Sequence, residues 1–154
     1  KVGYNVEGNE LGAAFGLEQL KKLDYNIATR QSNFKKQINF FEKYPDFFVN
    51  PIENPNCKTS WLAFPVLIKE EAPFTRKEFQ IFLEENKIQT RVVFTGNILR
   101  QPMCKGIKKK VTKFGLGNSD AVMKRGVLLP VHHGMTDQMF IRLHETIEEF
   151  IKKI

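Results

Sequence analysis

The sequence predicts an α+β fold in which a small sheet is covered by helices on one side. Apolar residues recur at three- and four-residue spacing near both ends of the chain, which indicates a long amphipathic helix at each end. Between these ends, short apolar runs are separated by helical segments, which is typical of a small sheet packed against helices. The length of 154 residues is that of one ordinary domain.

The first part of the chain, from Asn9 to about Tyr44, has a helical pattern. Asp24 predicts a break or a second cap between two helices. Prolines then predict an irregular connector over residues 45–60. We therefore divide the chain into a helical arm, residues 1–45, and a compact α+β unit, residues 46–154. Apolar residues at helical spacing run through the arm: Leu11, Phe15, Ile27, Phe34, Ile38 and Phe41.

Three short apolar runs are predicted to be strands. Trp61–Lys69 is apolar on both faces, and Pro65 within it predicts a position at a sheet edge or beside a bulge. Thr90–Phe94 is a second short strand. The sequence VLLPV, residues 127–131, is a third strand or extended segment.

Capping residues predict the helices between and after the strands. Thr75 and Glu78 match a capping box, in which each side chain satisfies a backbone N–H of the other residue. Thr136 is expected to cap a final helix whose apolar residues keep helical spacing to the last residue. A brief helix before the last strand has two candidate caps and a glycine stop: Asn118, Ser119 and Gly126.

Charge and hydropathy restrict the function classes. No apolar run approaches the roughly 20 residues that cross a bilayer. The net charge of +7 suits a polyanion or an anionic small molecule. Much of the excess lies in Lys105–Lys113, which has no Arg and no aromatic residue of the kind that reads or stacks bases. We interpret this stretch as a solvated loop, with a nucleic-acid patch as the alternative.

The sequence gives little support for a metal or redox site. Cys57 and Cys104 lack the spacing of a metal-ligand set, so we expect free thiols in a reducing cytoplasm, with a disulfide as the alternative. His132 and His133 are adjacent on an extended segment and point to opposite faces, so they do not easily share one metal. His132 is a candidate for lining an anion or sugar pocket, and an ordinary turn before the final helix is the alternative.

The segment FTGNILRQP, residues 94–102, is the strongest candidate for ligand binding. It follows a strand and offers the donors Asn97, Arg100 and Gln101, with Arg91 shortly before. Such groups suit a sugar hydroxyl or a diphosphate. Equally, these polar groups could cap the following turn. No catalytic triad, paired carboxylates, GxGxxG or Walker loop is present, so the residues alone identify no reaction.

Two long motifs resemble a known enzyme family. GYN followed by ELGAAFGLEQLKKLD, and then R..NF, resembles the DegT/DnrJ/EryC1/StrS family of pyridoxal-phosphate (PLP) sugar enzymes, with Gly12 where the family has Gln. The segments SWLAFPVLIKEEAPFTRKEF and TRVVFTGNILRQP are similar to one branch, the nucleotide-4-keto-6-deoxyhexose 3-dehydrases, above all the CDP-linked enzyme. The resemblance covers nearly the whole chain.

This resemblance implies a fold-type I enzyme, related to aspartate aminotransferase, of which the chain is the small C-terminal part. The Schiff-base Lys, or the His that replaces it in 3-dehydrases, and the Asp at the pyridinium nitrogen would lie upstream. The chain alone would then have no catalytic residue and bind no cofactor, whereas the complete protein would use pyridoxal 5'-phosphate or pyridoxamine 5'-phosphate. Any iron–sulfur cysteines would also lie upstream.

The resemblance also implies roles for individual residues. Asn5 matches the Asn that reaches the cofactor phosphate of the other subunit in a homodimer. The residues of the branch-specific loop near the nucleotide-sugar pocket are matched by Arg91, Asn97, Arg100 and Gln101, with His132 a weaker candidate. Glu7 departs from the Arg of many members. The segment GIKKKVTKFGLGNSD departs from the usual aromatic approach to the loop, which leaves the nucleotide preference open.

Three functions remain open from the sequence. The first is a cytoplasmic 3-dehydrase that removes the C3 hydroxyl of a nucleotide-linked 4-keto-6-deoxyhexose in deoxysugar, lipopolysaccharide and O-antigen biosynthesis, with neither nucleic acid nor membrane as partner. The second is a sister aminotransferase of the same fold. The third is a stand-alone nucleotide- or nucleic-acid-binding module, which the charge and the polar loop favour.

Overall fold

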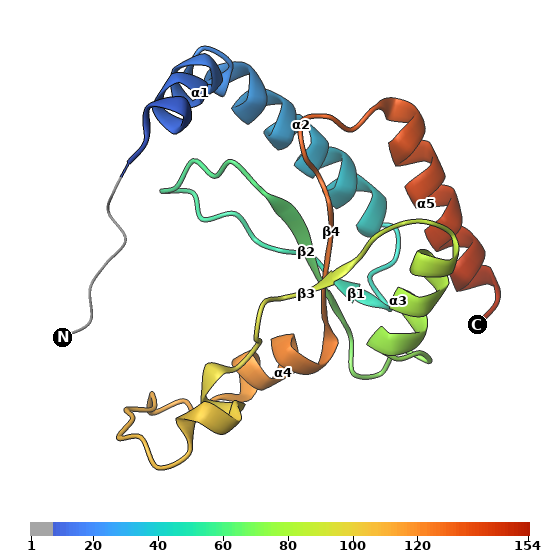
Figure 1. The fold of residues 1–154 in the computed structure, drawn as a ribbon. Helices are drawn as coiled ribbons and strands as arrows, with labels where there is room; N and C mark the ends of the chain where they lie inside the picture. The colour runs from blue at the N-terminus through green and yellow to red at the C-terminus, as the bar shows by residue number, and fades with distance from the viewer. Residues whose placement is uncertain (1–7) are drawn as a thin grey trace.

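The computed structural model of the protein describes residues 8–154 (Figure 1). Asn5 and Glu7, for which the sequence suggested a role at the cofactor, lie outside these residues. Within the described part, every helix is too short or too polar to span a bilayer. The elements in chain order are α1 (Glu10–Leu20), α2 (Leu23–Phe41), β1 (Phe48–Val49), β2 (Ala63–Ile68), α3 (Arg76–Glu85), β3 (Arg91–Val92), the 3-10 helices η1 (Ile98–Arg100) and η2 (Pro102–Cys104), α4 (Gly117–Arg125), β4 (Gly126–Pro130) and α5 (Asp137–Lys152).

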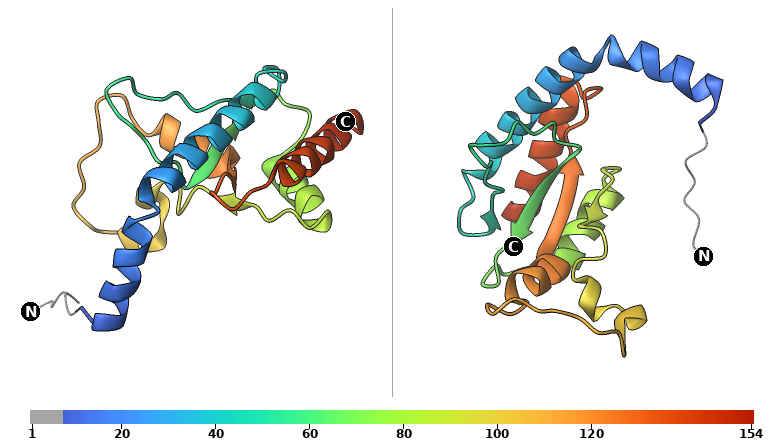
Figure 2. Two further views of the ribbon diagram at one scale, coloured as in Figure 1. Left: turned by 90° about the horizontal axis from the view of Figure 1, so that it is seen from above. Right: turned by 90° about the vertical axis from the view of Figure 1, so that its left-hand side faces the viewer.

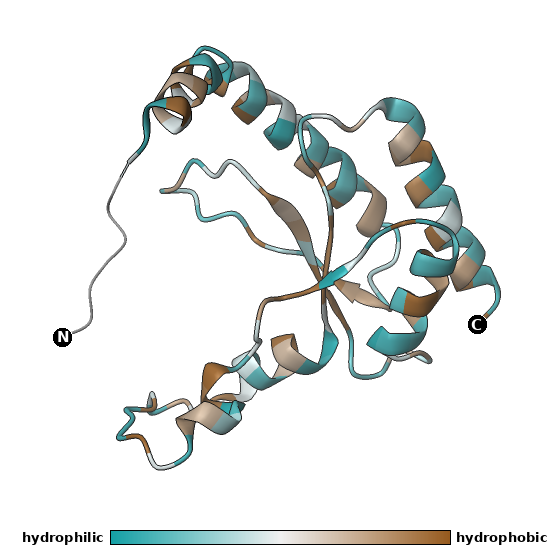
Figure 3. Cartoon of the chain, viewed as in Figure 1, coloured by the Kyte–Doolittle hydropathy of each residue, from teal (hydrophilic) through white to brown (hydrophobic). Residues whose placement is uncertain are grey.

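The four strands form one antiparallel sheet in the order β1-β2-β4-β3. Helices α2, α3 and α5 pack on one side of this sheet, and the segment from β3 to α4 projects from one end (Figure 1). This arrangement confirms the predicted α+β class with helices on one side. Figure 3 shows that β2 and β4, which pair along most of their length, are largely hydrophobic.

Buried and half-buried side chains alternate along β2, which distinguishes the two faces of the sheet. Phe64, Val66 and Ile68 are buried, whereas the residues between them are half-buried. Because successive side chains in a strand point to opposite faces, the buried set faces the helices and the other set forms an open face. On the helical side, the rings of Phe34 and Phe41 each lie 5.3 Å from the ring of Phe64. The core therefore lies between the sheet and the helices.

Pro65 lies in an inner strand, but its neighbourhood resembles an edge. It is paired with Leu128 on β4. On the other side of β2, β1 pairs only with Leu67 and Ile68. Because β1 does not reach Pro65, the missing N–H of this proline costs no described ladder hydrogen bond. The edge position predicted for the strand of Pro65 is therefore wrong, because β2 lies between β1 and β4.

Two local predictions are wrong. The connector predicted to be irregular over residues 45–60 contains β1, because Phe48 is buried and pairs with Ile68 at the end of β2. Neither Asn118 nor Ser119 caps α4, which has Leu116 as its N-cap and no capping side chain. The expected stop of α4 at Gly126 is confirmed.

The other predicted caps are confirmed. Glu78 N donates to Thr75 Oγ1 at 3.3 Å, and Thr75 N donates to Glu78 Oε2 at 2.7 Å, which completes the capping box of α3. Thr136 Oγ1 accepts a hydrogen bond from Met139 N at 3.3 Å at the start of α5. These local side-chain bonds fix where both helices begin.

The helical arm consists of two helices with different environments. The helix is interrupted at Lys21 and Lys22, just before Asp24, so the predicted break between two helices is nearly correct. No residue of α1 is buried, and Leu11 remains 85% exposed. All views show α1 standing away from the sheet (Figures 1 and 2). By contrast, α2 contributes to the core, so the proposed division at residue 45 stays a prediction that needs a folding test.

Two buried amides of α2 hold the end of β4. Gln37 is fully buried, and its Nε2 donates to Pro130 O at 3.2 Å. Asn33 Nδ2 donates to His132 O at 3.0 Å. These bonds supply partners for carbonyl groups that would otherwise be unpaired near the core, and they fix the backbone on which His132 stands.

His144 is a partly buried ring that stays neutral in the folded protein. It stacks on Phe40 with ring centroids 3.9 Å apart, and its Nε2 lies 3.0 Å from Gln37 Oε1. Burial first, and then the charge of Lys43, lower the pKa of His144 from 6.5 to about 4, although Glu148 opposes this shift. The unfolded chain therefore takes up a proton at a higher pH than the folded protein does.

We expect this histidine to weaken the fold in acid. Both states are neutral above pH 6.5, so the effect is absent there and develops as the pH falls from 6.5 to about 4. After a discount for partial exposure, the expected loss is about 1–2 kcal/mol. Urea unfolding at several pH values, compared with His144→Gln as the non-titrating control, measures it. Equal pH profiles for the two proteins would contradict the assignment.

Candidate functional site

The polar loop after β3 is shaped by two residues with positive φ. Phe94 has a φ of 46° and Gly96 a φ of 65°. This left-handed backbone is incompatible with a continuing strand, so β3 ends before the predicted boundary at Phe94. Asn97 then begins η1, and its Oδ1 accepts a hydrogen bond from Leu99 N at 3.1 Å.

Asp120 on α4 joins two of the residues predicted to bind substrate. Asn97 Nδ2 donates to Asp120 Oδ1 at 2.8 Å. Arg100 forms a two-pronged contact, with Nε 3.0 Å from Oδ1 and Nη2 2.7 Å from Oδ2 of the same carboxylate. Asn97 is only 3% exposed. The fork of Arg100 is therefore directed at Asp120, a residue that the sequence did not single out.

The network keeps the Asp120 carboxylate ionised. Hydrogen bonds from Arg100 first, and then from Asn97, lower the pKa of Asp120 from 3.8 to about 2. Because the folded state holds the proton less tightly than the unfolded state, this interaction stabilises the fold above pH 3.8. Its contribution is lost as the pH falls through about 2.

We expect Asp120→Asn to lower the Tm at neutral pH, because the charge opposite Arg100 is removed. The difference in Tm from wild type should shrink as the pH falls from 3.8 towards 2. Thermal unfolding followed by circular dichroism checks this result, and Asp24→Asn, which changes an exposed acid in the first turn of α2, is the matched control. A Tm difference that is constant over this pH range would contradict the proposed role of the ion pair.

Gly96 allows the loop to approach α4 closely. A Cβ at this position would lie 2.4 Å from Met123 Cβ and 2.6 Å from Met123 Cα. Gly96 therefore meets two requirements at once, a left-handed backbone and a close approach to another backbone. Together with the Asp120 network, this contact holds the loop in one position relative to α4.

Gln101 also bonds within the loop, because its Nε2 donates to Thr95 O at 3.0 Å. Of the residues predicted to bind substrate, Asn97, Arg100 and Gln101 therefore stabilise the loop itself. This observation supports the alternative in which polar groups fix the local turn.

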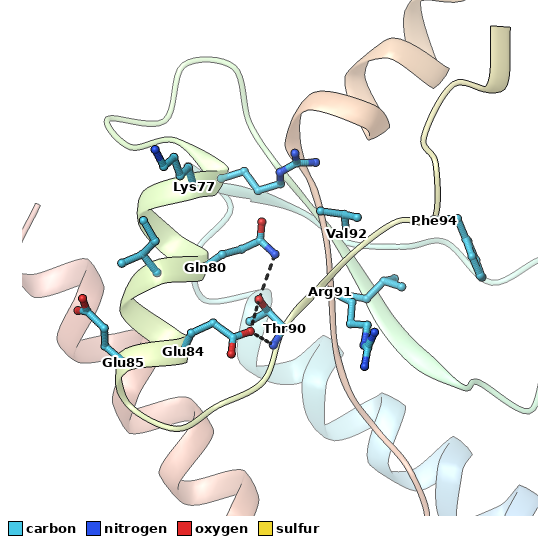
Figure 4. Close-up of a pocket in the computed structure, with 11 residues that line it drawn as sticks. Lys77, Gln80, Glu84, Glu85, Thr90, Arg91, Val92 and Phe94 are labelled. Atoms are coloured by element: carbon cyan, nitrogen blue, oxygen red, sulfur yellow. Dashed lines mark hydrogen bonds between the residues drawn. The ribbon is translucent and has the colours of Figure 1, made fainter. Parts of the chain in front are cut away.

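Arg91 lines an open pocket of about 970 Å³ between α3 and β3 (Figure 4). On the α3 side, Glu84 accepts hydrogen bonds from the N–H and the hydroxyl of Thr90, and Gln80 donates to that hydroxyl at 3.0 Å. Arg91 and Phe94 line the pocket as well, and in Figure 4 both side chains point away from α3. Within the described residues, no hydrogen bond or ion pair involves the Arg91 side chain.

His132 lies apart from the loop. It follows the end of β4 at Pro130, whereas the loop packs against Met123 on α4, just before the start of β4 at Gly126. His132 Nδ1 accepts a hydrogen bond from Gly134 N at 3.2 Å, and the ring lines a separate pocket of about 400 Å³ with Arg142. The structure therefore does not bring His132 together with the other predicted residues.

The remaining candidate ligands are scattered. His133 Nδ1 lies 3.4 Å from Arg30 Nη2, so His133 has a different environment from His132. Cys57 and Cys104 are free thiols. Residues 8–154 contain no group of three or more His, Cys, Asp or Glu side chains arranged to hold a metal ion.

Sequence reasoning missed Asp120 and Phe94. Asp120 follows Arg100 by 20 positions, and no sequence pattern pairs the two before the loop and α4 are seen together. In the sequence, Asp120 is recognisable only as an acidic residue in the first turn of a predicted helix, a position that favours a negative charge. The positive φ of Phe94 has no signature in the sequence, because residues other than glycine rarely adopt it.

Comparisons with curated proteins identify sugar-modifying enzymes. The chain is 35% identical over 152 residues to dTDP-4-dehydro-2,6-dideoxy-D-glucose 3-dehydratase of Saccharopolyspora spinosa, covering 99% of the chain and 32% of the relative. It is 31% identical over 149 residues to lipopolysaccharide biosynthesis protein RfbH of Salmonella typhimurium, covering 97% and 34%. A dTDP-4-amino-4,6-dideoxy-D-glucose transaminase of Escherichia coli is 28% identical over 142 residues, covering 92% and 38%.

Solved structures share the fold. GDP-4-keto-6-deoxy-D-mannose-3-dehydratase of Escherichia coli, with bound hydrated PLP, matches with a TM-score of 0.83 and 28% identity over 95% of this chain and 37% of that chain. A GDP-4-keto-6-deoxymannose-3-dehydratase variant with bound GDP-perosamine matches with a TM-score of 0.84 and 28% identity, covering 96% and 37%. The chain thus spans about a third of the length of the proteins it matches.

These matches agree with the resemblance carried by the GYN and TRVVFTGNILRQP motifs, and with the small fold-type I unit that the motifs implied. A family model for the DegT/DnrJ/EryC1/StrS aminotransferase family matches residues 1–148. The match covers both motifs, the sheet and all helices except the end of α5. The chain therefore belongs to the DegT/DnrJ/EryC1/StrS aminotransferase family.

Proposed function

We propose that the chain is the C-terminal part of a PLP-dependent 3-dehydratase that removes the C3 oxygen of a nucleotide-linked 4-keto-6-deoxyhexose. The observation that carries this proposal is the alignment with a sugar 3-dehydratase along 99% of the chain, including the loop after β3. A role in the biosynthesis of lipopolysaccharide sugars, in the cytoplasm, is consistent with the likeness to RfbH.

In this proposal the loop of residues 94–101 contacts the nucleotide sugar. Asn97, Arg100 and Gln101 act by holding the loop rigid, since their polar groups are bonded to Asp120 and to Thr95 O. A rigid loop loses little conformational entropy when a ligand binds, which favours affinity. Arg91 is exposed and available to bind an anionic group of the substrate.

The cofactor, when bound, supplies the electron sink that activates the sugar carbons next to the 4-keto group. We propose Asn5 as a contact to its phosphate across a homodimer. Within residues 8–154, the buried side-chain atom without a hydrogen-bond partner is Asn50 Oδ1, an acceptor, which does not suit a phosphate. The described residues therefore do not form a cofactor site by themselves, and the remaining groups would come from outside them.

A sister transaminase is the second candidate, because a sugar transaminase also aligns with 92% of the chain. The test is to express the complete protein that contains the chain and to incubate it with PLP, L-glutamate and dTDP-, CDP- or GDP-linked 4-keto-6-deoxysugars. Mass spectrometry distinguishes the outcomes. A product that lacks the C3 oxygen supports the dehydratase, whereas replacement of the 4-keto oxygen by an amine supports the transaminase.

A stand-alone binding module is the third possibility and predicts different behaviour. If neither sugar product forms, and the chain binds random DNA with a steep salt dependence, the enzymatic proposal is wrong. The basic segment Lys105–Lys113, which is exposed along its whole length, would then be the binding surface.

A further inference from the structure

The loop after β3 has few side chains left for a ligand once its internal bonds are counted. Asn97, Arg100 and Gln101 are engaged by Asp120 and by Thr95 O. The large side chains that remain free at the start of the loop are Phe94 and, just before it, Arg91. These offer an aromatic face and a cation rather than a set of sugar-hydroxyl donors.

Phe94 is unusual in both backbone and exposure. Its φ of 46° lies in the left-handed region, which a bulky residue adopts only at an energetic cost. Its side chain is 86% exposed, so burial in the described structure does not offset that cost. Within residues 8–154, no aromatic pair involves this ring. Strained residues held by their surroundings occur preferentially at functional sites, so the conformation of Phe94 indicates a functional role.

The surroundings hold Phe94 rigidly. Two residues later, Gly96 packs against the backbone of Met123 at a position where an added Cβ would clash, so that only glycine fits there. One residue further, Asn97 is buried and bonded to Asp120. The exposed ring is therefore presented from a fixed backbone, which limits the entropy lost when a planar group stacks on it.

The electrostatic setting favours an anionic ligand. Arg91 and Phe94 line the same pocket and point away from α3 (Figure 4). The pocket is also lined by the cations Arg76 and Lys77 and, on the α3 side, by the carboxylates Glu84 and Glu85, so three cations with Arg91 stand against two acids. Opposite charge raises the local concentration of a phosphate-bearing ligand.

We propose that Phe94 is the stacking platform for the nucleobase of the nucleotide sugar and that Arg91 binds the adjoining phosphate. The face of a nucleobase can bind by stacking, without hydrogen bonds, and the ring of Phe94 has no hydrogen-bonding group. A guanidinium group suits phosphate oxygens. The inference rests on the proposed function for the class of its ligand, and it assigns a base-binding role to a residue that is strained and exposed.

Nucleotide binding by the purified 154-residue chain tests this inference. Phe94→Trp places a fluorescent ring at the site, and we expect CMP, GMP, UMP or dTMP to quench its emission while ribose 5-phosphate does not. Phe94→Leu should weaken binding of the best nucleotide about tenfold, measured by calorimetry, because the stacking face is lost. Phe114→Leu is the matched control, since Phe114 is also 86% exposed, and it should bind as wild type does.

A stability measurement separates this role from a structural one. Asn tolerates a left-handed backbone, so Phe94→Asn should keep or raise the Tm while it loses as much nucleotide affinity as Phe94→Leu. Several results would overturn the inference: no nucleotide binding by the wild-type chain, equal affinity of wild type and Phe94→Leu, or ribose 5-phosphate binding as tightly as a nucleotide. A dimer that Phe94→Leu dissociates, without nucleotide binding, would show that a second copy covers the ring.

The outcomes also separate this inference from the proposed reaction. If the complete protein converts the sugar and Phe94→Leu leaves KM and kcat unchanged, the base-stacking role alone is wrong. If the complete protein converts no sugar, but Phe94→Leu still lowers nucleotide affinity, the reaction is wrong and the stacking role stands.

Discussion

Gly96→Ala should lower the free energy of unfolding by about 2–5 kcal/mol, the largest effect that we expect from a single substitution near the site. An alanine at φ 65° is strained, which costs about 1–2 kcal/mol. Its Cβ would also lie 2.4 Å from Met123 Cβ, so the loop and α4 must separate, which adds about 1–3 kcal/mol. Urea unfolding measures the change.

Gly106→Ala is the control for this prediction. Gly106 has a φ of 76°, but nothing lies within 4 Å of the position of an added Cβ. This variant should therefore show only the backbone cost of about 1–2 kcal/mol. Met123→Ala should not rescue Gly96→Ala, because Met123 Cα and Cβ, which alanine retains, are themselves too close. Equal losses for the two glycine variants would show that the contact with α4 is not tight.

Removing α2 should abolish folding, whereas removing α1 alone should not. The chain beginning at residue 46 lacks three buried phenylalanines, Phe34, Phe40 and Phe41. At about 1.5–3 kcal/mol for each buried side chain, the loss is about 5–9 kcal/mol, comparable with the whole stability of a typical domain. Among the described residues, the chain beginning at residue 23 loses no buried side chain, because α1 has none.

Circular dichroism and amide NMR spectra of the two shortened chains measure this difference. The chain of residues 23–154 should melt cooperatively near the Tm of the full chain. The chain of residues 46–154 should lack a cooperative transition. A folded 46–154 chain would contradict the expectation and would support the boundary at residue 45 that the sequence suggested.

Local signals predicted much of the fold. The Thr75–Glu78 capping box and the Thr136 cap have their partners within three positions, so short-range sequence is sufficient to locate α3 and α5. By contrast, β1 exists because Phe48 and Val49 pair with the far end of β2. Such a two-residue strand depends on a distant partner and has no periodicity of its own, so the sequence could not indicate it.

The same distinction explains the site. The composition of residues 94–102 marked a polar loop, and the loop is where the structure concentrates Asn97 and Arg100. The sequence could not predict where the side chains of Asn97 and Arg100 point. Their partner Asp120 becomes adjacent to them only when α4 packs beside the loop. The strained Phe94 was overlooked because its backbone, rather than its residue type, makes it unusual.

An amide NMR titration with CMP, GMP, UMP and dTMP tests most directly whether residues 91–101 form the nucleotide contact of this chain. We expect chemical-shift changes at residues 91–101 and at Asp120, which is bonded to that loop. Changes confined to Lys105–Lys113, or to the separate pocket around His132, with none at residues 91–101, would contradict this expectation.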